Sequence, residues 1–237
     1  MKIVLTGYGR MGHMIEQVAQ EKGSERTGRV DVTNVPDLKT MPAADVVIDF
    51  SHPAMLEAVE EYVKRTGAAL VSGTTGYDES HMERLQRLSE FAPVVHSANY
   101  SMGIALFRHL LQQMPQALLE NFDIEILEKH HNKKVDAPSG TAKMLLSALD
   151  PEREKRVVTG REGMCGARAK DEIGVMALRG GTVAGEHTVY LFGEDETLAI
   201  THTASSRRIF AVGAVNAAAA LAGRPKGWYR LDDILFH

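Results

Sequence analysis

Two histidines and three lysines lie within residues 128–141, which read Glu-Lys-His-His-Asn-Lys-Lys-Val-Asp-Ala-Pro-Ser-Gly-Thr. An imidazole exchanges protons near neutral pH, and an ammonium group can donate a proton or hold an anion. Pro138 keeps the residue before it out of the helical conformation and Ser139 is a good cap, so a helix should begin near Gly140 and Thr141. The first amides of a helix can bind a carboxylate or phosphate. This stretch therefore predicts acid–base groups beside an anion site.

Two other interpretations of this stretch remain open. A cluster of histidine and lysine can be a solvated basic loop. Histidine is also a common metal ligand, but His130 and His131 are adjacent and point to opposite faces of an extended chain. The sequence places no cysteine or further histidine at ligand spacing nearby, so we expect no metal site. Alternating apolar residues in 122–127 predict a strand that delivers both histidines to its carboxyl end.

A second candidate site lies at the start of the chain. Residues 7–12 read Gly-Tyr-Gly-Arg-Met-Gly, after an apolar strand at residues 2–6 and before a helix that ends near Gly23. In this context the glycines form the turn and let a pyrophosphate approach the backbone at the helix N-terminus. The pattern predicts a dinucleotide site, although a glycine-rich turn can also serve only to pack a helix on a sheet.

An acidic residue usually follows the second strand of such a unit and binds the adenosine ribose. Asp31 lies at that distance from the glycines. An aspartate here favours the free 2′-hydroxyl of NAD, whereas Arg29 or Lys39 could meet the phosphate of NADP. A solvated surface aspartate is the alternative.

Strands and helices alternate through the first hundred residues, which predicts a parallel doubly wound sheet with ligands at the carboxyl ends of its strands. From Ile104 the pattern changes to an α+β unit with an open, largely antiparallel sheet, in which Gly180-Gly181 and residues 193–195 form hairpin turns. One face of such a sheet needs a cover, so we expect an oligomer.

The strands are expected at residues 45–50, 68–72, 93–96, 156–159, 173–178, 183–192 and 197–203, and the helices at 54–65, 79–91, 104–114 and 209–222.

Composition excludes several classes of protein. The net charge of −4 argues against a nucleic-acid partner, which needs a basic surface. No apolar run approaches a membrane span and no signal peptide is evident, so we expect a cytoplasmic protein. Cys165 is the only cysteine, so no internal disulfide can form.

Further short motifs accompany these two sites. They are Asp49-Phe50-Ser51, Gly73-Thr74-Thr75-Gly76, Ser97-Ala98-Asn99-Tyr100-Ser101, Arg179-Gly180-Gly181, Gly185-Glu186-His187, His202 and Ser206-Arg207. With them the chain resembles the 4-hydroxy-tetrahydrodipicolinate reductase family, also called dihydrodipicolinate reductases. The resemblance covers nearly the whole chain, and its most specific part is residues 130–141.

The resemblance implies a Rossmann-like doubly wound dinucleotide-binding domain, residues 1–101 and 207–237, and a substrate-binding and oligomerisation domain, an α+β unit with an open mixed sheet, at residues 102–206. It implies NADH or NADPH as cofactor, a small cyclic imine dicarboxylate as substrate, and a homo-oligomer, expected to be a tetramer. By motif, His130 would be the catalytic acid/base and Lys134 a second proton donor. The implied substrate contacts are His131, Lys134, Ser139, Gly140 and Thr141. The implied cofactor contacts are Gly7, Tyr8, Gly9, Arg10, Met11, Gly12, Asp31, Gly73, Thr74, Thr75, Ala98, Asn99 and Tyr100.

The activity implied is reduction of the cyclic imine by hydride from NAD(P)H with loss of water, in lysine and diaminopimelate biosynthesis. A related dehydrogenase of another amino or imino dicarboxylate, such as aspartate, is the first alternative. A nucleotide-binding protein without turnover is the second, although such a protein has no use for His130 and Lys134.

Overall fold

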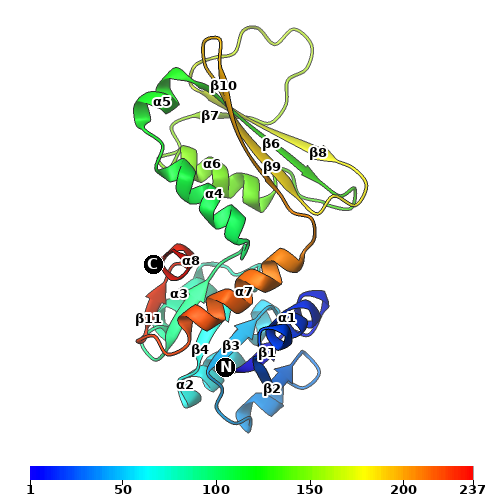
Figure 1. Cartoon of the computed structure of the whole chain (residues 1–237), viewed down its shortest axis with the longest axis vertical. Helices are drawn as coiled ribbons and strands as arrows, with labels where there is room; N and C mark the ends of the chain where they lie inside the picture. The colour runs from blue at the N-terminus through cyan, green and yellow to red at the C-terminus, as the bar shows by residue number, and fades with distance from the viewer. Residues whose placement is uncertain (237) are drawn as a thin grey trace. The chain divides into compact units, whose positions relative to one another are not determined.

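The computed structural model describes residues 1–236, apart from the side chain of Gln116, and the chain divides into two compact units (Figure 1). Unit 1 combines Met1–Met102 with the chain from Arg208 onward. Unit 2 is Gly103–Arg207.

Unit 1 is built on a six-stranded sheet in which all neighbouring strands are parallel. In the order β11-β5-β4-β3-β1-β2, its strands span Gly227–Tyr229, Pro93–His96, Ala69–Ser72, Val46–Asp49, Lys2–Thr6 and Glu25–Val30. The four central strands are almost continuously apolar, as expected for strands that are buried on both faces.

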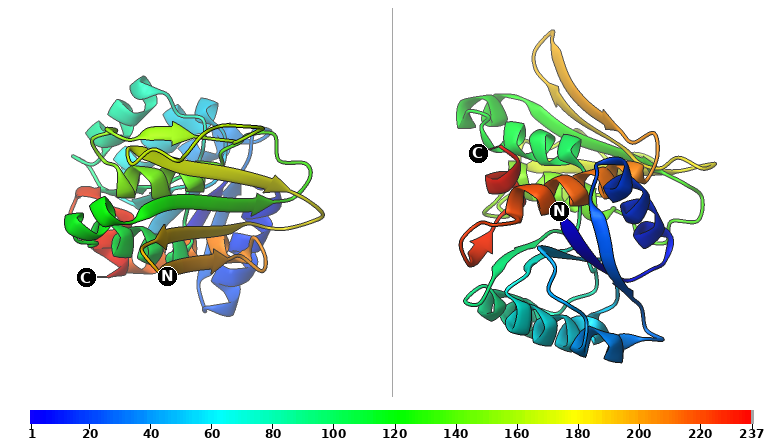
Figure 2. Two further views of the ribbon diagram at one scale, coloured as in Figure 1. Left: turned by 90° about the horizontal axis from the view of Figure 1, so that it is seen from above. Right: turned by 60° about the horizontal axis from the view of Figure 1, so that its bottom comes forward.

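Helices cover both faces of this sheet. On one face, α1 (Arg10–Glu21), α7 (Arg208–Leu221) and α8 (Leu231–Leu235) pack on alternate strand residues, and α1 lies beside α7 (Figure 2). On the other face, α2 (Leu56–Thr66) and α3 (Glu79–Leu88) pack on the remaining strand residues. Two short 3₁₀ helices, η1 (Val35–Lys39) and η2 (Pro53–Met55), complete the unit.

The predicted doubly wound sheet is confirmed, and most of its element boundaries differ from the expected ones by only a few residues. Two differences concern short segments. Residues 35–39 form a short 3₁₀ helix, and β11 with α8 adds an edge strand and a short α-helix; the sequence predicted none of these elements. Elements of three to five residues are too short to show a hydrophobic period.

Unit 2 is a five-stranded mixed sheet with helices on one face. In the order β10-β9-β6-β8-β7, its strands span Thr197–Thr203, Glu186–Phe192, Asp123–His130, Glu172–Arg179 and Arg156–Val158. Its helices are α4 (Met102–Gln112), α5 (Gln116–Asn121) and α6 (Gly140–Leu149). Apolar residues of α4 and α6 form one core with the inward-facing residues of β6, β8 and β9.

The expectation of a largely antiparallel sheet, with a hairpin at Gly180-Gly181, is wrong. β6 pairs with β8 and β8 with β7 in parallel, whereas only the β6–β9 and β9–β10 pairs are antiparallel. Because β6 lies between β8 and β9, the turn at Gly180-Gly181 reverses the chain without joining neighbouring strands. The hairpin between β9 and β10 is confirmed. Turn residues predict a change of direction, but long-range pairing decides which strands are neighbours.

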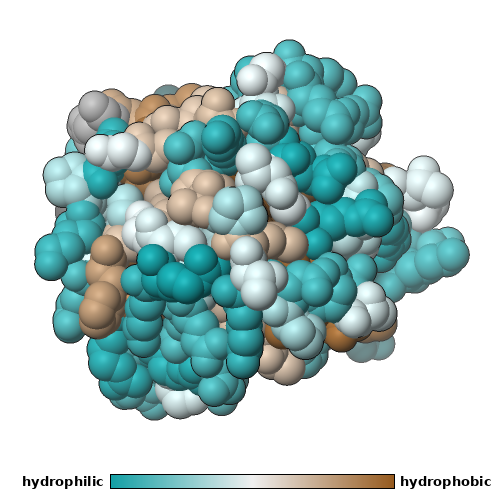
Figure 3. Space-filling model, turned by 90° about the horizontal axis from the view of Figure 1, so that it is seen from below, coloured by the Kyte–Doolittle hydropathy of each residue, from teal (hydrophilic) through white to brown (hydrophobic). Residues whose placement is uncertain are grey.

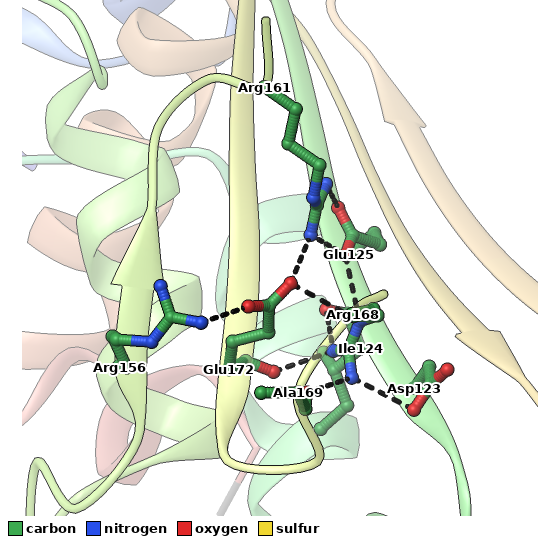
Figure 4. A network of polar contacts seen from close by, with 8 residues as sticks. All are labelled: Asp123, Ile124, Glu125, Arg156, Arg161, Arg168, Ala169 and Glu172. Atoms are coloured by element: carbon green, nitrogen blue, oxygen red, sulfur yellow. Dashed lines mark hydrogen bonds and ion pairs between the residues drawn. The ribbon is translucent and has the colours of Figure 1, made fainter. Parts of the chain in front are cut away.

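Residues 159–171 are fastened to the sheet of unit 2 by a cluster of arginine–carboxylate pairs (Figure 4). Arg161 contacts both Glu125 and Glu172 at 2.8 and 2.7 Å, and Arg168 donates to Asp123 at 2.8 Å and to Glu125 at 3.2 Å. These pairs lie on the face of β6 that carries Glu125, opposite to the face that packs on α4 and α6. The excursion between β7 and β8 is therefore attached to the sheet at two points.

Among residues 1–236, no helix has both the length and the apolar character needed to cross a membrane. In the space-filling view, hydrophilic residues surround smaller apolar areas (Figure 3).

Candidate active site

Strand β6 carries the first histidine of the cluster on its inner face. Residues alternate along this strand, so that Glu128 and His130 share the face that also carries Ile124 and Ile126. Glu128 is fully buried and His130 is nearly so. The predicted strand is confirmed, although it continues to His130 itself.

The Glu128 carboxylate accepts four hydrogen bonds inside unit 2. Arg179, the residue paired with His130 on β8, donates to both carboxylate oxygens at 2.8 Å. The backbone amide of Ser139 donates at 3.0 Å, and Nδ1 of His130 makes a very short contact. Burial alone would raise the pKa of Glu128, but the bonds from Arg179, His130 and Ser139 outweigh it and the pKa lies below its usual value. Glu128 is therefore a carboxylate at neutral pH.

The helix predicted to begin at Gly140 is present, and Ser139 caps it. The Ser139 hydroxyl accepts from the Ala142 amide at 3.2 Å, and α6 runs from Gly140 to Leu149. The first turn of α6 carries no acidic side chain. The first amides and the positive end of the helix dipole can therefore receive an anion.

His187, on β9, lies against the Ser139 cap of α6. Nε2 of His187, on β9, is 3.1 Å from the Ser139 hydroxyl, and the His187 ring meets the His130 ring edge-on at 5.1 Å between centroids. Burial, followed by repulsion from His130, lowers the pKa of His187 to about 4. His187 is therefore neutral at physiological pH and adds no charge beside His130.

The remaining predicted substrate residues lie on the loop between β6 and α6. Nζ of Lys134 contacts Asp136 at 2.7 Å, and its ammonium keeps two further protons for other acceptors. Nε2 of His131 lies 3.5 Å from Nη2 of Arg207. Burial and then the charge of Arg207 lower the pKa of His131. The structure therefore brings His130, His131, Lys134, Ser139, Gly140 and Thr141 onto one end of β6, the following loop and the start of α6.

Within residues 1–236, no group of histidine, cysteine, aspartate or glutamate side chains has an arrangement suited to a metal ion.

In unit 1 the glycine motif forms a tight strand-to-helix turn. Gly7 has φ +85°, and a Cβ at this position would lie 2.2 Å from the carbonyl oxygen of Phe50. A Cβ on Gly12 would lie 2.3 Å from the carbonyl oxygen of Gly7. Gly9 caps α1 without a side-chain hydrogen bond, and Arg10 begins the helix. Tyr8 and Met11 are half-buried on the face of the sheet that α1 and α7 cover. Glycine is therefore required at Gly7 and Gly12 by the packing of the chain itself, because a side chain at either position would collide with a backbone carbonyl oxygen.

Asp31 follows directly on β2, and its carboxylate is held by its own turn. It accepts from the Thr33 amide at 2.8 Å and from the Thr33 hydroxyl at 2.6 Å, and these bonds lower the pKa of Asp31. Nearby, the guanidinium of Arg29 lies 4.5 Å from the centre of the Tyr8 ring. An acid and a cation therefore both lie close to the end of β2.

The loops after β3 and β4 are tied together by the buried carboxylate of Asp49. It accepts from the hydroxyls of Thr6 at 2.6 Å, Thr74 at 2.7 Å and Tyr77 at 3.3 Å. The Gly73 amide donates to the Asp49 carbonyl at 2.7 Å. The strand ends that carry the predicted cofactor residues therefore meet at one edge of the sheet, as parallel strands require.

Not every predicted cofactor residue presents its side chain at this edge. The Tyr100 ring is buried, and its hydroxyl donates to the Ser72 carbonyl at 2.8 Å, so only its backbone could contact a ligand. The Thr74 hydroxyl is engaged by Asp49. Thr75 and Ala98 are exposed, and the Asn99 side chain accepts from the Ser101 amide at 2.8 Å.

Five residues of this site were given no role by sequence reasoning, namely Glu128, Arg179, Gly185, His187 and Arg207. Glu128 could have been found because it precedes His130 by two, and residues two apart on a strand share a face. The other four lie in motifs that carry the family resemblance, but their types and spacing gave no role. The others reach the site only through the pairing of β8 and β9 with β6 and through the chain after β10.

Comparison with known proteins agrees with this organisation. Residues 1–100 match the family model described as "Dihydrodipicolinate reductase, N-terminus", and residues 103–235 match "Dihydrodipicolinate reductase, C-terminus". The 4-hydroxy-tetrahydrodipicolinate reductase of Brachyspira hyodysenteriae is 40% identical over 99% of this chain and 100% of the relative. That of Staphylococcus carnosus is 42% identical over 99% of each chain.

Solved structures show the same fold. A dipicolinate-bound dihydrodipicolinate reductase from Paenisporosarcina sp. TG-14 superposes with a TM-score of 0.77, at 20% identity and 99% coverage of both chains. An amine dehydrogenase from Mycobacterium smegmatis gives a TM-score of 0.63 at 11% identity, with 98% of this chain and 95% of that chain covered. By its match to both family models and its identity to full-length relatives, the chain belongs to the dihydrodipicolinate reductase family.

Proposed function

We propose that this protein reduces 4-hydroxy-tetrahydrodipicolinate to tetrahydrodipicolinate, with hydride from a nicotinamide cofactor and loss of water, in lysine and diaminopimelate biosynthesis. Family membership along the whole chain supports the reaction. The observation that carries the proposal is the buried Glu128–His130 pair beside the capped N-terminus of α6, because this pair offers a proton next to an anion site.

The substrate is a cyclic imine with two carboxylates, and unit 2 presents positive groups to receive them. One carboxylate would bind the first amides of α6 at Gly140 and Thr141, where the helix dipole favours an anion. His131, beside Arg207, and the Lys134 ammonium would contact the same substrate. Ser139 would act by fixing the start of the helix.

Proton transfer would belong to His130, with Lys134 as a second donor. A ring carbon of the substrate gains a proton in the reaction, and an imidazole can supply one near neutral pH. A positioned acid typically contributes about 10²- to 10⁴-fold to the rate.

Unit 1 would hold the dinucleotide. The tight glycine turn leads into the start of α1, where the N-cap residue Gly9 makes no side-chain hydrogen bond, so the first amides of the helix would be offered to a pyrophosphate. When bound, the reduced nicotinamide supplies the hydride. The loops that begin at Gly73 and Ala98 lie at the same sheet edge and would contact the rest of the cofactor.

We propose NADH or NADPH as the cofactor. The Asp31 carboxylate suits the two ribose hydroxyls of NADH, and the Arg29 guanidinium offers a cation to the 2′-phosphate of NADPH. Steady-state titration with each cofactor decides between them.

We also propose that the protein self-associates as a tetramer through the open face of the sheet in unit 2. The helices α4 and α6 cover only the other face. On the open face, Leu178 is 52% exposed and Phe192 41% exposed, and Tyr190 stacks on Phe192 at 5.4 Å. A second copy of the same sheet would remove these apolar groups from water.

The direct experiment supplies the purified protein with the condensation product of pyruvate and aspartate semialdehyde and follows the absorbance of reduced nicotinamide. We expect rapid oxidation of reduced nicotinamide with the cyclic substrate and none with the imine of aspartate, and we expect no reduction of NAD(P)⁺ with aspartate. His130→Gln should lower kcat at least ~100-fold while the affinity for the dinucleotide stays unchanged. Absence of oxidation with both NADH and NADPH would exclude the assignment.

A further inference from the structure

Glu128 is a buried carboxylate that contacts the proposed acid, His130, without itself giving a proton to the substrate. It is fully buried on the inner face of β6, two residues before His130. Burying a charge is unfavourable unless every acceptor site is matched. Here the two oxygens are matched by the bidentate guanidinium of Arg179, the Ser139 amide and Nδ1 of His130.

These contacts determine which ring nitrogen of His130 carries a proton. A carboxylate only accepts hydrogen bonds, so Nδ1 must be an N–H. Burial tends to raise the pKa of Glu128, but the bonds from Arg179, His130 and Ser139 hold it below the usual range, so the acceptor stays ionised. Neutral His130 is therefore protonated at Nδ1 and has its lone pair on Nε2.

The second ring nitrogen of His130, Nε2, faces Gly185. Because Nδ1 faces Glu128, Nε2 lies on the opposite side of the ring. A Cβ on Gly185 would lie 3.1 Å from Nε2 and 3.5 Å from the neighbouring ring carbon. Gly185 has φ +153°, a conformation that side-chain-bearing residues rarely adopt. The chain before β9 thus leaves Nε2 without a covering side chain at this position.

The carboxylate itself is fixed by groups that also form the anion site. Arg179 is the last residue of β8 and is paired with His130, and its Nη2 also donates to the Asp136 carbonyl at 2.8 Å. The Ser139 amide belongs to the residue that caps α6. The orientation of Glu128, the loop of Lys134 and the start of α6 are therefore determined together.

We propose that Glu128 is a positioning residue that holds His130 in the Nδ1–H form, directs Nε2 toward the substrate and balances the charge of the imidazolium. When His130 gives its Nε2 proton to a substrate carbon, the N–H bond breaks, the C–H bond forms and the ring returns to the neutral Nδ1–H form. Glu128 remains a carboxylate throughout. This inference rests on the proposed role of His130 as the acid, but the orientation of the ring can be tested without turnover.

The simplest rival is a purely structural ion pair between Glu128 and Arg179. Unit 1 contains a matched example, in which Arg84 donates to both oxygens of the mostly buried Glu60 at 3.1 and 2.9 Å, with no histidine in the pair. Glu60→Gln is therefore the control for loss of a bidentate pair, because it removes the same charge from the same kind of contact away from the proposed site.

The first measurement is nitrogen NMR of the histidine side chains in the wild-type protein labelled with ¹⁵N-histidine. The resonances of His130 are identified by their loss in His130→Gln. We expect the Nδ1–H form with a strongly hydrogen-bonded proton. A neutral His130 protonated at Nε2 would overturn the inference, whether or not the protein turns over substrate.

The second measurement compares the kinetics of Glu128→Gln and Glu60→Gln per folded molecule, with folding checked by circular dichroism. A glutamine can donate to Nδ1 and so favour the opposite tautomer. We expect kcat to fall at least ~10-fold in Glu128→Gln, with KM and dinucleotide affinity within about 2-fold of wild type. Glu60→Gln should keep wild-type kcat even if it lowers thermal stability.

Each outcome has a distinct meaning. If wild type turns over the cyclic substrate and Glu128→Gln keeps its kcat, the positioning role is wrong. If wild type shows no turnover, the proposed function fails, and the NMR result alone decides whether Glu128 orients the ring. If Glu128→Gln does not fold, the tautomer of the wild-type His130 still decides.

Discussion

The buried neutral histidine behind the helix cap should make unit 2 sensitive to acid. His187 is 4% exposed, and burial, followed by repulsion from His130, lowers its pKa to about 4. In the unfolded chain a histidine titrates near its ordinary value of about 6.5. As pH falls, the unfolded state therefore takes up the proton first, and stability that is fully present above pH 6.5 is lost toward pH 4.

The magnitude follows from the two pKa values. The pKa of His187 falls from an ordinary 6.5 in the unfolded chain to about 4 in the fold. At about 1.4 kcal/mol for each pH unit, this difference corresponds to about 3 kcal/mol of unfolding free energy. Small domains are stable by only about 5–15 kcal/mol, so this is a substantial share. His130, Glu128, His202 and Lys134 all act electrostatically on His187, which makes the figure specific to the assembled site.

The assay compares wild type with His187→Asn between pH 7 and pH 4. Unfolding in urea is monitored through the hydrogen exchange of the β9 amides. These amides report on unit 2 and not on unit 1. The variant loses packing at every pH, which lowers its unfolding free energy by a constant amount. The informative quantity is therefore the difference between wild type and variant in how steeply the unfolding free energy falls with pH. We expect wild type to lose about 3 kcal/mol more than the variant over this range. Parallel curves of unfolding free energy against pH would show instead that His187 takes up a proton as easily in the folded as in the unfolded chain.

Three further predictions follow from the two units. Gly7→Ala would place a Cβ 2.2 Å from the Phe50 carbonyl oxygen at a φ of +85° and so distort the turn. Dinucleotide affinity, measured by calorimetry, should fall at least ~10-fold while the hydrogen exchange of unit 2 stays unchanged. Unaltered affinity would remove this turn from the cofactor site. Lys134→Ala should lower kcat/KM about 10²-fold or more, and an unchanged kcat/KM would exclude both a donor and a carboxylate-binding role. Leu178→Glu would put a charge on the open face of the sheet, and light scattering should show a smaller assembly than wild type; an unchanged mass would place the interface elsewhere.

Local chemistry in the sequence predicted the elements that carry the site. Pro138, Ser139 and Gly140 favour the backbone conformation and the cap with which a helix begins. The helix α6 begins at Gly140, as these residues predicted. The glycines from Gly7 to Gly12 likewise form the strand-to-helix turn that their spacing predicts. Such features depend on a few neighbouring residues, so the sequence contains nearly all the information that determines them.

What the sequence did not predict depends on contacts between distant segments. Arg179 reaches Glu128 only because β8 pairs in parallel with β6, and the same pairing made the expected hairpin at Gly180-Gly181 wrong. His187 enters the site from β9 on the other side of β6. The Tyr100 ring points into the core. The polar neighbours of Tyr100 in the sequence, Asn99 and Ser101, gave no indication of this burial. Strand order, and not local propensity, decides these positions.

The most direct test of the reductase assignment follows an isotope from cofactor to product. Wild-type protein is supplied with the cyclic substrate and nicotinamide cofactor deuterated at the hydride position, and the product is analysed by mass spectrometry and NMR. We predict one deuterium on a ring carbon of tetrahydrodipicolinate for each cofactor oxidised, and a large loss of this transfer in His130→Gln with unchanged cofactor binding. Product without deuterium would rule out the reductase assignment, and undiminished transfer in His130→Gln would rule out His130 as the acid.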